Sequence, residues 1–335
     1  MHRVEIDSDK TGLVAEVVGA MDIPVQDESA THSFSWNGKP TDLANAYLAI
    51  VAICHQTSPP GERQLEGYIG SARKRGWDYL KEKFLLRAVQ DGRWASRDFW
   101  IVLTPGDLSA LYEDASLGKS LNRITERTFL LNDLGSMLRQ RGFTRIEEAF
   151  AACGRAALDG GGFLQFLKQF EAYKDPVCKK SLFFLSVAAS ECGWRILDGD
   201  KLRCPVDYHE LRGHLRLGTV RVGDANLAFK LKTGLPFAEA DDTKLRGVVQ
   251  EIDDIIVRRA SISSSALHYF LWNVFRCCCP RDSALTHCAG SQSCTLPDPY
   301  KGLLSPHESC VFSEVCASAK ETHKPAEPPY IGHFY

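Results

Sequence analysis

The chain of 335 residues is 44% hydrophobic, so it can bury a full core as one large domain or as two lobes. Its 40 Lys and Arg residues stand against 42 Asp and Glu residues, which gives a formal net charge of −2. A disordered chain is far less apolar, and a protein that grips a long duplex usually carries an overall basic charge. The composition therefore excludes a disordered chain and disfavours, without excluding, a nucleic-acid polymer as partner.

The sequence predicts a cytoplasmic protein that makes no contact with a membrane. No segment approaches the roughly 20 consecutive apolar residues that span a bilayer. The acidic residues Glu5 and Asp7 stand where a signal peptide would be apolar. In a reducing compartment the 12 cysteines are not expected to form a disulfide framework. Their positions are more informative than their number, because seven of them lie between Cys277 and Cys316.

Segments with apolar residues at helical spacing dominate the chain. Thr41 and Asp42 can cap a helix that runs to Cys54. Further helices are predicted over 62–74, 77–89, 124–141, 146–158, 163–170, 177–194, 245–259 and 261–276. Strand signals are limited to the short segments 100–103 and 217–222, which form either minor ribbons or irregular structure. Because there is no repeat of fixed period and no glycine-rich phosphate loop, we expect a mainly α fold without a nucleotide-cofactor site of the usual kinds.

Asp207 is a candidate catalytic group. It stands at the start of a helix predicted to run to about Leu217, and with Glu210 it forms a capping-box pattern. A helix cap is by itself the commoner role for such a residue. Cleavage of an N-glycosidic bond, however, develops positive charge on the sugar, and a carboxylate beneath it stabilises that charge or attacks it. Because helix N–H groups favour an ionised carboxylate, Asp207 can serve as both cap and catalyst.

Two adjacent lysines, Lys179 and Lys180, lie near the start of the apolar helix predicted over 177–194. Such a helix start offers backbone N–H groups and cationic side chains to one anion. A solvated helix edge is the alternative. A Schiff base on Lys180 would require a desolvated amine with a lowered pKa, which a sequence does not reveal.

The chain resembles the queuosine 5′-phosphate N-glycosidases of queuosine salvage, over roughly 300 residues and in a shared order of segments. The segments that carry the resemblance are Ser33–Trp36, Thr125–Gly135, Phe170–Asp175 with Lys179–Lys180, Val206–Tyr208, Leu267–Asn273 and Ile331–Tyr335. The resemblance implies a two-lobed helical fold related to the helix-hairpin-helix DNA glycosylases. It implies an active site between the lobes, around residues 173–217.

The same resemblance assigns roles to individual residues. It implies Asp207 as the catalytic carboxylate and Lys180 as a supporting cation. The implied substrate-binding residues are Trp36, Lys179, Tyr208, Trp272 and Tyr335, of which Trp36, Tyr208 and Trp272 can sandwich a flat base. The segment Ile331–Tyr335 is less basic than its counterpart in that family, which weakens the expectation that the substrate carries a 5′-phosphate.

The cysteine-rich segment after residue 276 has no counterpart in that family. It resembles the loop of the iron–sulfur DNA glycosylases of the endonuclease III and MutY kind, whose last two cysteines are separated by five residues. Cys310 and Cys316 have this spacing, and Cys277 falls where the first ligand of that loop would be.

The resemblance leaves one ligand of the loop open, among Cys288, Cys294 and His307, while Cys278 and Cys279 are expected to be bystanders. A [4Fe–4S] cluster is the expected cofactor, zinc is the alternative, and unligated or disulfide-linked thiols are the third possibility. The predicted organisation is a helical N-glycosidase body over 1–276 and a metal-stabilised cysteine loop and tail over 277–335.

Three functions agree with these features. The first is hydrolysis of the bond between a modified nucleobase and its sugar in a queuosine-type nucleotide or nucleoside. Near-neutral charge supports it, as does the lack of glycine in 170–177, where DNA glycosylases of this fold bind phosphates. The second is a DNA glycosylase for repair or anti-phage defence, supported by the cysteine loop and the basic run Arg73–Arg75. The third is a non-catalytic, metal-stabilised module that binds nucleosides or nucleic acid, with Asp207 only a cap.

Overall fold

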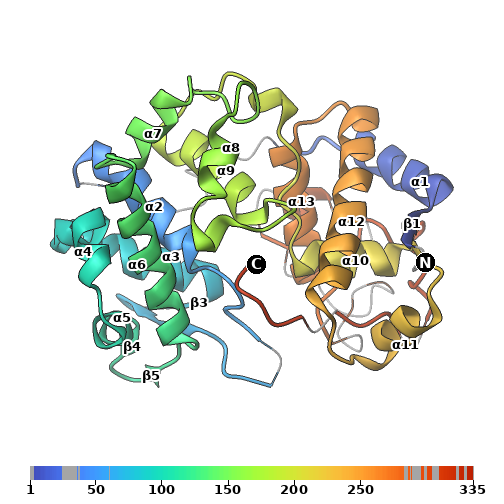
Figure 1. Cartoon of the computed structure of the whole chain (residues 1–335). Coiled ribbons are helices and arrows are strands. Elements are labelled where there is room, and N and C mark those ends of the chain that lie inside the picture. Colours follow the sequence, from blue (N-terminus) through green and yellow to red (C-terminus); the bar gives the residue numbers. More distant parts are fainter. Residues whose placement is uncertain are drawn as a thin grey trace. The chain divides into compact units, whose positions relative to one another are not determined.

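The computed structural model describes residues 4–24, 36, 38–59, 61–282, 286, 288, 296–297, 300–303, 309–321, 324–327 and 330–334. Helices dominate these residues and the strands among them are short (Figure 1). The mainly α fold predicted from the spacing of apolar residues is therefore confirmed. No helix within the described residues is both long enough and apolar enough to cross a membrane.

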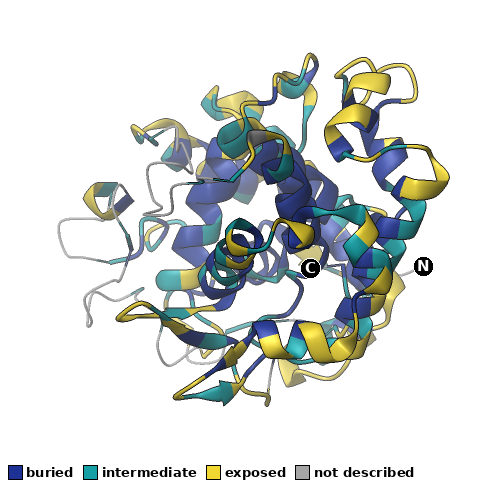
Figure 2. Ribbon diagram, turned by 90° about the vertical axis from the view of Figure 1, so that its left-hand side faces the viewer, coloured by how far each residue is buried: buried dark blue, intermediate teal, exposed yellow. Residues whose placement is uncertain are grey.

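The chain divides into two compact units, each assembled from segments that are distant in sequence. Unit 1 consists of Met1–Gln26 and Leu202–Ile331, and unit 2 consists of Asp27–Lys201 and Gly332–Tyr335. In both units the buried positions lie on the inner faces of the helices, while loops and outer helix turns are exposed (Figure 2).

Unit 1 is built on one long helix. Its described helices are α1 (Ser8–Gly19), α10 (Tyr208–Leu217), α11 (Ala225–Thr233), α12 (Glu239–Ala260), α13 (Ser264–Cys277) and the 3-10 turn η6 (Tyr300–Leu303). α1 and α10 both pack on α12, and α13 packs on α10 and α12. Strands β1 (Val4–Ile6) and β6 (Val220–Val222) pair antiparallel, with Val4 opposite Val222. The strand predicted near 217–222 is thus present over three residues.

Unit 2 is built around α2, which is buried from Leu43 to Ala52. Its described helices are α2 (Pro40–Ala52), α3 (Gly76–Gln90), α4 (Arg97–Val102), α5 (Pro105–Leu111), α6 (Ile124–Gln140), α7 (Ile146–Ala152), α8 (Phe163–Leu167) and α9 (Lys179–Cys192), with 3-10 turns η2 (Gly92–Ala95), η3 (Glu171–Tyr173) and η4 (Gly199–Lys201). α3, α6, α7 and α9 all pack on α2. Two hairpins complete the unit: β2 (Glu66–Ile69) with β3 (Ala72–Arg75), and β4 (Glu113–Asp114) with β5 (Gly118–Lys119).

The helix predicted over 62–74 is wrong, because this segment forms the β2–β3 hairpin. Gly70 has a φ of +58° and with Ser71 forms a two-residue turn, a conformation that suits glycine and joins antiparallel strands. Gly67 lies so close to the ring of Tyr79 that a Cβ atom would collide with it. The glycines therefore serve a turn and a close contact that a helix would not require.

The strand predicted over 100–103 is also wrong, because these residues lie in and just after α4. The Ser96 hydroxyl accepts the N–H of Asp98 at 3.3 Å and so caps this helix. On the other side, Gly135 of α6 has no side chain, which allows α4 to approach so closely that a Cβ would collide with the Arg97 carbonyl. Within the apolar run, Trp100 and Leu103 are buried while Val102 is exposed, so the run belongs to a helix that packs on α6 with one side only.

Candidate functional site

Asp207 is the N-cap residue of α10 in unit 1, and the predicted capping box is confirmed. Its Oδ1 accepts the backbone N–H of His209 at 2.7 Å and that of Glu210 at 3.2 Å. The Glu210 carboxylate accepts the N–H of Asp207 at 3.1 Å in return. Since both backbone bonds fall on Oδ1, the second oxygen, Oδ2, has no hydrogen-bond donor within the described part of the chain. The side chain of Asp207 is thus fixed by one oxygen and offers the other.

Glu210 connects this cap to α13. It is fully buried, and its Oε1 lies 2.8 Å from Nδ1 of His268. Burial, followed by the negative charges of Asp253 and Asp207, raises the pKa of Glu210 well above its ordinary value. The contact between Glu210 and His268 ties two helices together at the residue that orients Asp207.

Tyr208 and His209, which directly follow Asp207, form a group of rings with Trp272 in unit 1. The ring of Tyr208 lies 4.3 Å from the ring of His209, measured between centroids. The ring of His209 makes an edge contact with Trp272 at 6.0 Å, and the guanidinium of Arg276 lies 4.3 Å from the Trp272 ring centroid. Two predicted aromatic residues, Tyr208 and Trp272, are therefore brought together. The sequence did not indicate His209, because only the fold shows that its ring lies between those of Tyr208 and Trp272.

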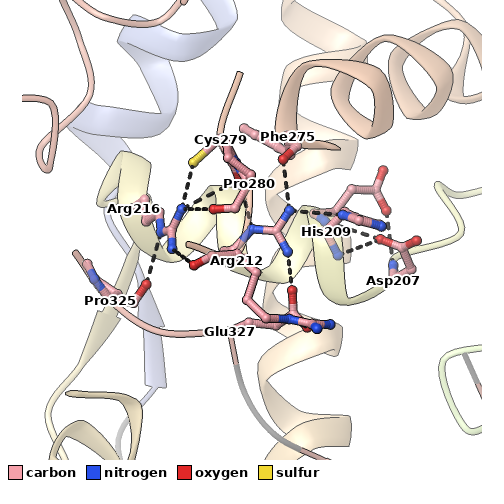
Figure 3. Close-up of polar contacts among 11 residues, drawn as sticks. Asp207, His209, Arg212, Arg216, Phe275, Cys279, Pro280, Pro325 and Glu327 are labelled. Atoms are coloured by element: carbon pink, nitrogen blue, oxygen red, sulfur yellow. Dashed lines mark hydrogen bonds and ion pairs between the residues drawn. The ribbon is translucent and has the colours of Figure 1, made fainter. Parts of the chain in front are cut away.

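Arg212 joins this group to the cysteine-rich segment, as Figure 3 shows. Its Nη2 lies 2.9 Å from Nδ1 of His209 and donates to the Phe275 carbonyl at 2.8 Å. Its Nε donates to the Cys279 carbonyl at 2.9 Å, and its Nη1 pairs with Glu327. Arg212 is almost entirely buried, so its charge is balanced within the protein. One side chain of α10 thus holds both the aromatic group and the segment that follows α13.

Lys180 belongs to unit 2, where it is completely buried. Its Nζ donates to the carbonyl of Ala52 at 2.5 Å and lies 3.3 Å from Nδ1 of His55. Burial is the main cause that lowers the pKa of Lys180 to about 7, and the charges of Lys179 and Arg127 act in the same direction. The amine is therefore desolvated, the property that the sequence left open.

The polar cluster continues from His55 to Glu126. Nε2 of His55 lies 2.9 Å from Oε1 of Glu126, whose Oε2 pairs with Arg123 at 2.5 Å. Burial, together with the positive charges of Arg127 and Lys180, lowers the pKa of His55 well below its ordinary value. His55 is consequently a neutral imidazole at neutral pH, and it links the Lys180 amine to a carboxylate.

Residues 332–334 contact the same cluster in unit 2. Arg123 donates to the carbonyl of Gly332 at 2.9 Å, and Nε2 of His333 lies 3.3 Å from the Glu171 carbonyl. The rings of His333 and His55 are 6.4 Å apart. Burial, and then the charge of Lys180, lower the pKa of His333.

A structural role for Lys180 is visible in the same contacts. The last carbonyls of a helix have no partner within the helix and favour cations. Lys180 donates to the carbonyl of Ala52, the last residue of α2. Arg127 donates to the carbonyls of Ile53 and His55, the latter at 2.7 Å. The two cations together cap the C-terminal end of α2.

The remaining predicted binding residues lie in unit 2 or outside the described residues. The backbone N–H of Lys179 donates to Asp175 at 2.9 Å, and its ammonium lies 5.0 Å from the Phe183 ring centroid. Trp36 is half-buried and its indole N–H donates to the Lys39 carbonyl at 3.0 Å. Two further predicted residues, Tyr335 and Cys294, lie outside the described residues, as does His307.

The other predicted metal ligands, Cys277, Cys288, Cys310 and Cys316, are free thiols. Cys279 is free as well, whereas Cys278 is bonded in a disulfide. Among the described residues, no three Cys, His, Asp or Glu side chains are arranged to hold a metal ion. Burial raises the pKa of Cys310, and the charges of Cys279, Cys288 and Cys316 add to this effect. Burial, together with the charges of Cys288 and Cys279, raises the pKa of Cys316 to about 11. Cys279, Cys288, Cys310 and Cys316 thus lie within electrostatic reach of one another.

The basic run Arg73–Arg75, predicted to contact phosphates, lies on strand β3. Arg73 pairs with Glu66 at 2.7 Å, Arg75 pairs with the same carboxylate at 3.3 Å, and Lys74 pairs with Glu82 at 3.1 Å. Each cation of the run therefore has a carboxylate partner within unit 2, and Arg73 and Arg75 share the one of Glu66.

No protein-family model matches the chain, and no curated protein matches its sequence. The site is therefore described by its chemistry alone. In chemical terms, unit 1 offers a fixed carboxylate beside aromatic rings. Unit 2 offers a buried amine that is linked to a carboxylate through a neutral imidazole. The first arrangement suits the stabilisation of a cation that forms next to a flat group.

Proposed function

We propose that the protein is an N-glycosidase that hydrolyses the bond between a modified nucleobase and its sugar, with Asp207 as the catalytic carboxylate. The observation that carries the proposal is the fixed Asp207 carboxylate, whose Oδ2 is left over by the helix cap. Asp207 directly precedes Tyr208 and His209, whose rings form one group with Trp272. The resemblance to queuosine 5′-phosphate N-glycosidases supports the same reaction. It also supports a fold related to the helix-hairpin-helix DNA glycosylases.

The reaction requires a negative charge where the sugar becomes positive. As the bond to the base lengthens, the sugar acquires oxocarbenium character, and a carboxylate below C1′ stabilises it or forms a bond to it before water attacks. The backbone N–H groups of His209 and Glu210 hold the charge on Asp207 without side-chain movement, so little reorganisation is needed during the reaction. Glu210 is a positioning residue, because it acts through its bond to the backbone of Asp207.

The aromatic residues suit a flat base as the leaving group. Tyr208 and Trp272 are both half-buried, so part of each ring is available for stacking. Lys180 remains a candidate supporting cation, and its amine can act as one below its pKa of about 7.

A free nucleotide or nucleoside is favoured over DNA as the substrate. The three cations of Arg73–Arg75 are already paired with the two carboxylates of Glu66 and Glu82, so most of their charge is neutralised and little is left for a DNA backbone. The net charge of −2 points in the same direction. Excision of a base from DNA is the alternative, and it uses the same carboxylate and the same bond.

The test of this proposal is Asp207→Asn, assayed for release of free base from queuosine 5′-phosphate and from duplex DNA with a modified base. Asn caps helices about as well as Asp, so the free energy of unfolding is expected to change by less than about 1 kcal/mol. Base release is expected to fall by roughly 10²-fold or more, because the charge on the catalytic oxygen is lost.

The matched control is Asp224→Asn. Asp224 caps α11 through a bond of 2.7 Å from the N–H of Leu227, so the variant makes the same chemical change at another helix start. It is expected to release base at the wild-type rate. Equal rates for wild type and Asp207→Asn would refute the catalytic role, and binding of the nucleotide without any base release would identify a non-catalytic module.

A further inference from the structure

His209 contacts both the proposed catalytic carboxylate and the aromatic group of unit 1. Its backbone N–H donates to Oδ1 of Asp207 at 2.7 Å. Its ring lies 4.3 Å from the ring of Tyr208 and makes an edge contact with Trp272 at 6.0 Å, both measured between centroids. The side chain is half-buried. One residue therefore connects the cap of α10 to the rings that suit a flat base.

Arg212 decides which nitrogen of the His209 ring carries a hydrogen. Nη2 of Arg212 lies 2.9 Å from Nδ1 of His209. A guanidinium has only N–H donors and stays protonated in proteins, so the ring nitrogen that it contacts has to accept. Nδ1 therefore carries no hydrogen, and a neutral imidazole in this state bears its hydrogen on Nε2.

The guanidinium of Arg212 is held in one orientation, as Figure 3 shows. The second hydrogen of Nη2 is donated to the Phe275 carbonyl at 2.8 Å. Nε donates to the Cys279 carbonyl at 2.9 Å, and Nη1 pairs with Glu327. Because the group is planar and almost completely buried, it cannot turn away from His209 without breaking these bonds. The packing around α10 thus sets the hydrogen position of the ring.

The carboxylates near His209 do not reverse this assignment. Glu327 is bound by two arginines, Arg212 and Arg281, the latter at 2.6 Å, so its charge is compensated. The charge of Asp207 is held by backbone N–H groups at the helix start. The direct partner of the ring is a cation, so a second proton on His209 would bring two positive charges into contact. The ring is therefore a neutral donor.

A neutral imidazole with its hydrogen on Nε2 suits the leaving group of N-glycosidic cleavage. As the bond to the sugar breaks, its electron pair stays with the base, which becomes negative. A fixed donor stabilises that charge without movement of the protein. An ionised carboxylate such as Asp207 only accepts hydrogen bonds, so it serves the sugar and cannot serve the base.

We propose that His209 recognises the leaving base and donates the hydrogen of Nε2 to an acceptor atom on the edge of that base. The ligand class is a nucleobase with a carbonyl oxygen or an unprotonated ring nitrogen at its edge. Arg212 is a positioning residue, because it acts through Nδ1 of His209. The role of His209 rests on the proposed N-glycosidase function and supplies its base-binding half.

The reaction leaves His209 unchanged. The bond between C1′ and the base breaks with its electron pair on the base, and the oxygen of a water molecule forms the new bond to C1′. A proton of that water passes to the base, so the products are the free base and the free sugar. His209 keeps its hydrogen throughout and lowers the barrier by a hydrogen bond alone.

Two amide variants test the two nitrogens of the ring separately. His209→Asn keeps an acceptor near the position of Nδ1 and has no atom at the position of Nε2, whereas His209→Gln reaches that position with an N–H donor. Release of base from queuosine 5′-phosphate is expected to fall by roughly 10²-fold in His209→Asn. His209→Gln should stay within about tenfold of the wild type. It should unfold at a lower urea concentration, because Arg212 loses its acceptor.

The hydrogen position can also be measured on the wild-type protein, which covers the case in which a variant does not fold. In ¹⁵N NMR of the histidine rings near neutral pH, His209 is expected to show an unprotonated Nδ1 and a protonated Nε2. Its signals are assigned by their absence in either variant. A ring with hydrogen on Nδ1, or on both nitrogens, would overturn the role of His209.

The rates distinguish failure of this role from failure of the proposed function. If the wild type releases base and Asp207→Asn does not, an unchanged rate in His209→Asn would overturn the role of His209 alone. A larger loss in His209→Gln than in His209→Asn would overturn it as well, because only the contact with Arg212 would then matter. If the wild type releases no base, the N-glycosidase function fails, and the role of His209 fails with it.

Discussion

At the scale of single residues, burial decides what the ionisable groups of this protein can do. Lys180 and Lys174 are six residues apart, and only Lys180 is buried. The Lys174 ammonium is mostly exposed and pairs with Glu171, which raises its pKa, whereas burial lowers the pKa of Lys180 to about 7. The sequence shows two lysines of the same kind, and only the packing of α2 against α9 distinguishes them.

The two lysines therefore give contrasting titrations. In an NMR pH titration of protein labelled with ¹³C at the lysine Cε atoms, we expect one resonance whose chemical shift changes with a midpoint near pH 7. This resonance should be absent in Lys180→Met. The Lys174 resonance should titrate above the ordinary lysine pKa of 10.5. If every lysine titrated above about pH 10, in the ordinary range, the buried amine would be disproved.

The same shift predicts a direction for stability. The folded pKa of Lys180 lies below the unfolded value of 10.5, so between about pH 7 and 10.5 the unfolded chain binds a proton that the folded chain lacks. The Lys180 contribution to the free energy of unfolding therefore rises with pH across this window and is lost as the pH falls toward 7. Urea unfolding of wild type and Lys180→Met at several pH values isolates this contribution.

At the scale of elements, α10 was predictable because its signals are local. The N-cap pattern of Asp207 and Glu210 lies within four residues, and the same two residues form the capping box in the structure. The β2–β3 hairpin was missed because its partners are distant. The N–H of Tyr68 donates to Asp114 at 2.7 Å, and the Ser120 hydroxyl donates to the Glu66 carbonyl at 2.8 Å. No pattern within 62–74 reveals those contacts.

The candidate site shows the same difference between residues with local signals and residues that depend on distant contacts. Asp207 and its cap follow from the chain nearby, whereas the contact of Cys279 with Arg216 joins residues 63 positions apart. The spacing between cysteines points to Cys277, but spacing carries no information about which side of the helix end a residue faces. An arginine in the last turn of a predicted helix was the available signal, and only the fold shows that this side chain is buried.

Arg216 gives a test at this scale. Arg216→Lys keeps the positive charge but cannot reach the carbonyls of Pro280, Arg281 and Pro325 together. We expect the free energy of unfolding to fall by about 2–4 kcal/mol, because buried carbonyls lose their donors. Chemical denaturation monitored by circular dichroism measures the change.

The control for this variant is Arg221→Lys in the same unit. Arg221 has a side chain that is 63% exposed and pairs with Asp7 at 2.7 Å. An exposed ion pair contributes little, so the change should stay below about 0.5 kcal/mol. A similar loss for both variants would show that the fork of bonds made by Arg216 has no special importance.

At the scale of the whole molecule, each of the two units is stabilised by its own set of contacts. Arg212 and Arg216 hold residues after α13 to α10, and all of these belong to unit 1. The core of unit 2 is the apolar helix α2 and its neighbours. Loss of the bonds that Arg216 makes should therefore affect the two units differently.

Hydrogen exchange read by mass spectrometry tests this difference on the full chain. In Arg216→Lys, peptides from α10 and α13 are expected to lose protection by about tenfold or more, because Arg216 no longer holds the residues after α13. Peptides from α2 and α6 should exchange at the wild-type rate. Equal loss in both sets of peptides would contradict a support confined to unit 1.

The pairing of β1 with β6 also governs the order in which the chain can be assembled during synthesis. Asp7, directly after β1, binds Arg221 of β6, and the two residues are 214 positions apart. A ribosome adds roughly 5–20 residues per second, so β1 emerges about 10–40 seconds before its partner strand exists. Throughout that interval the middle of the chain can fold while Val4–Ile6 presents an unpaired edge. A nascent-chain binding factor that covers Val4–Ile6 would shield that edge until Val220–Val222 is synthesised.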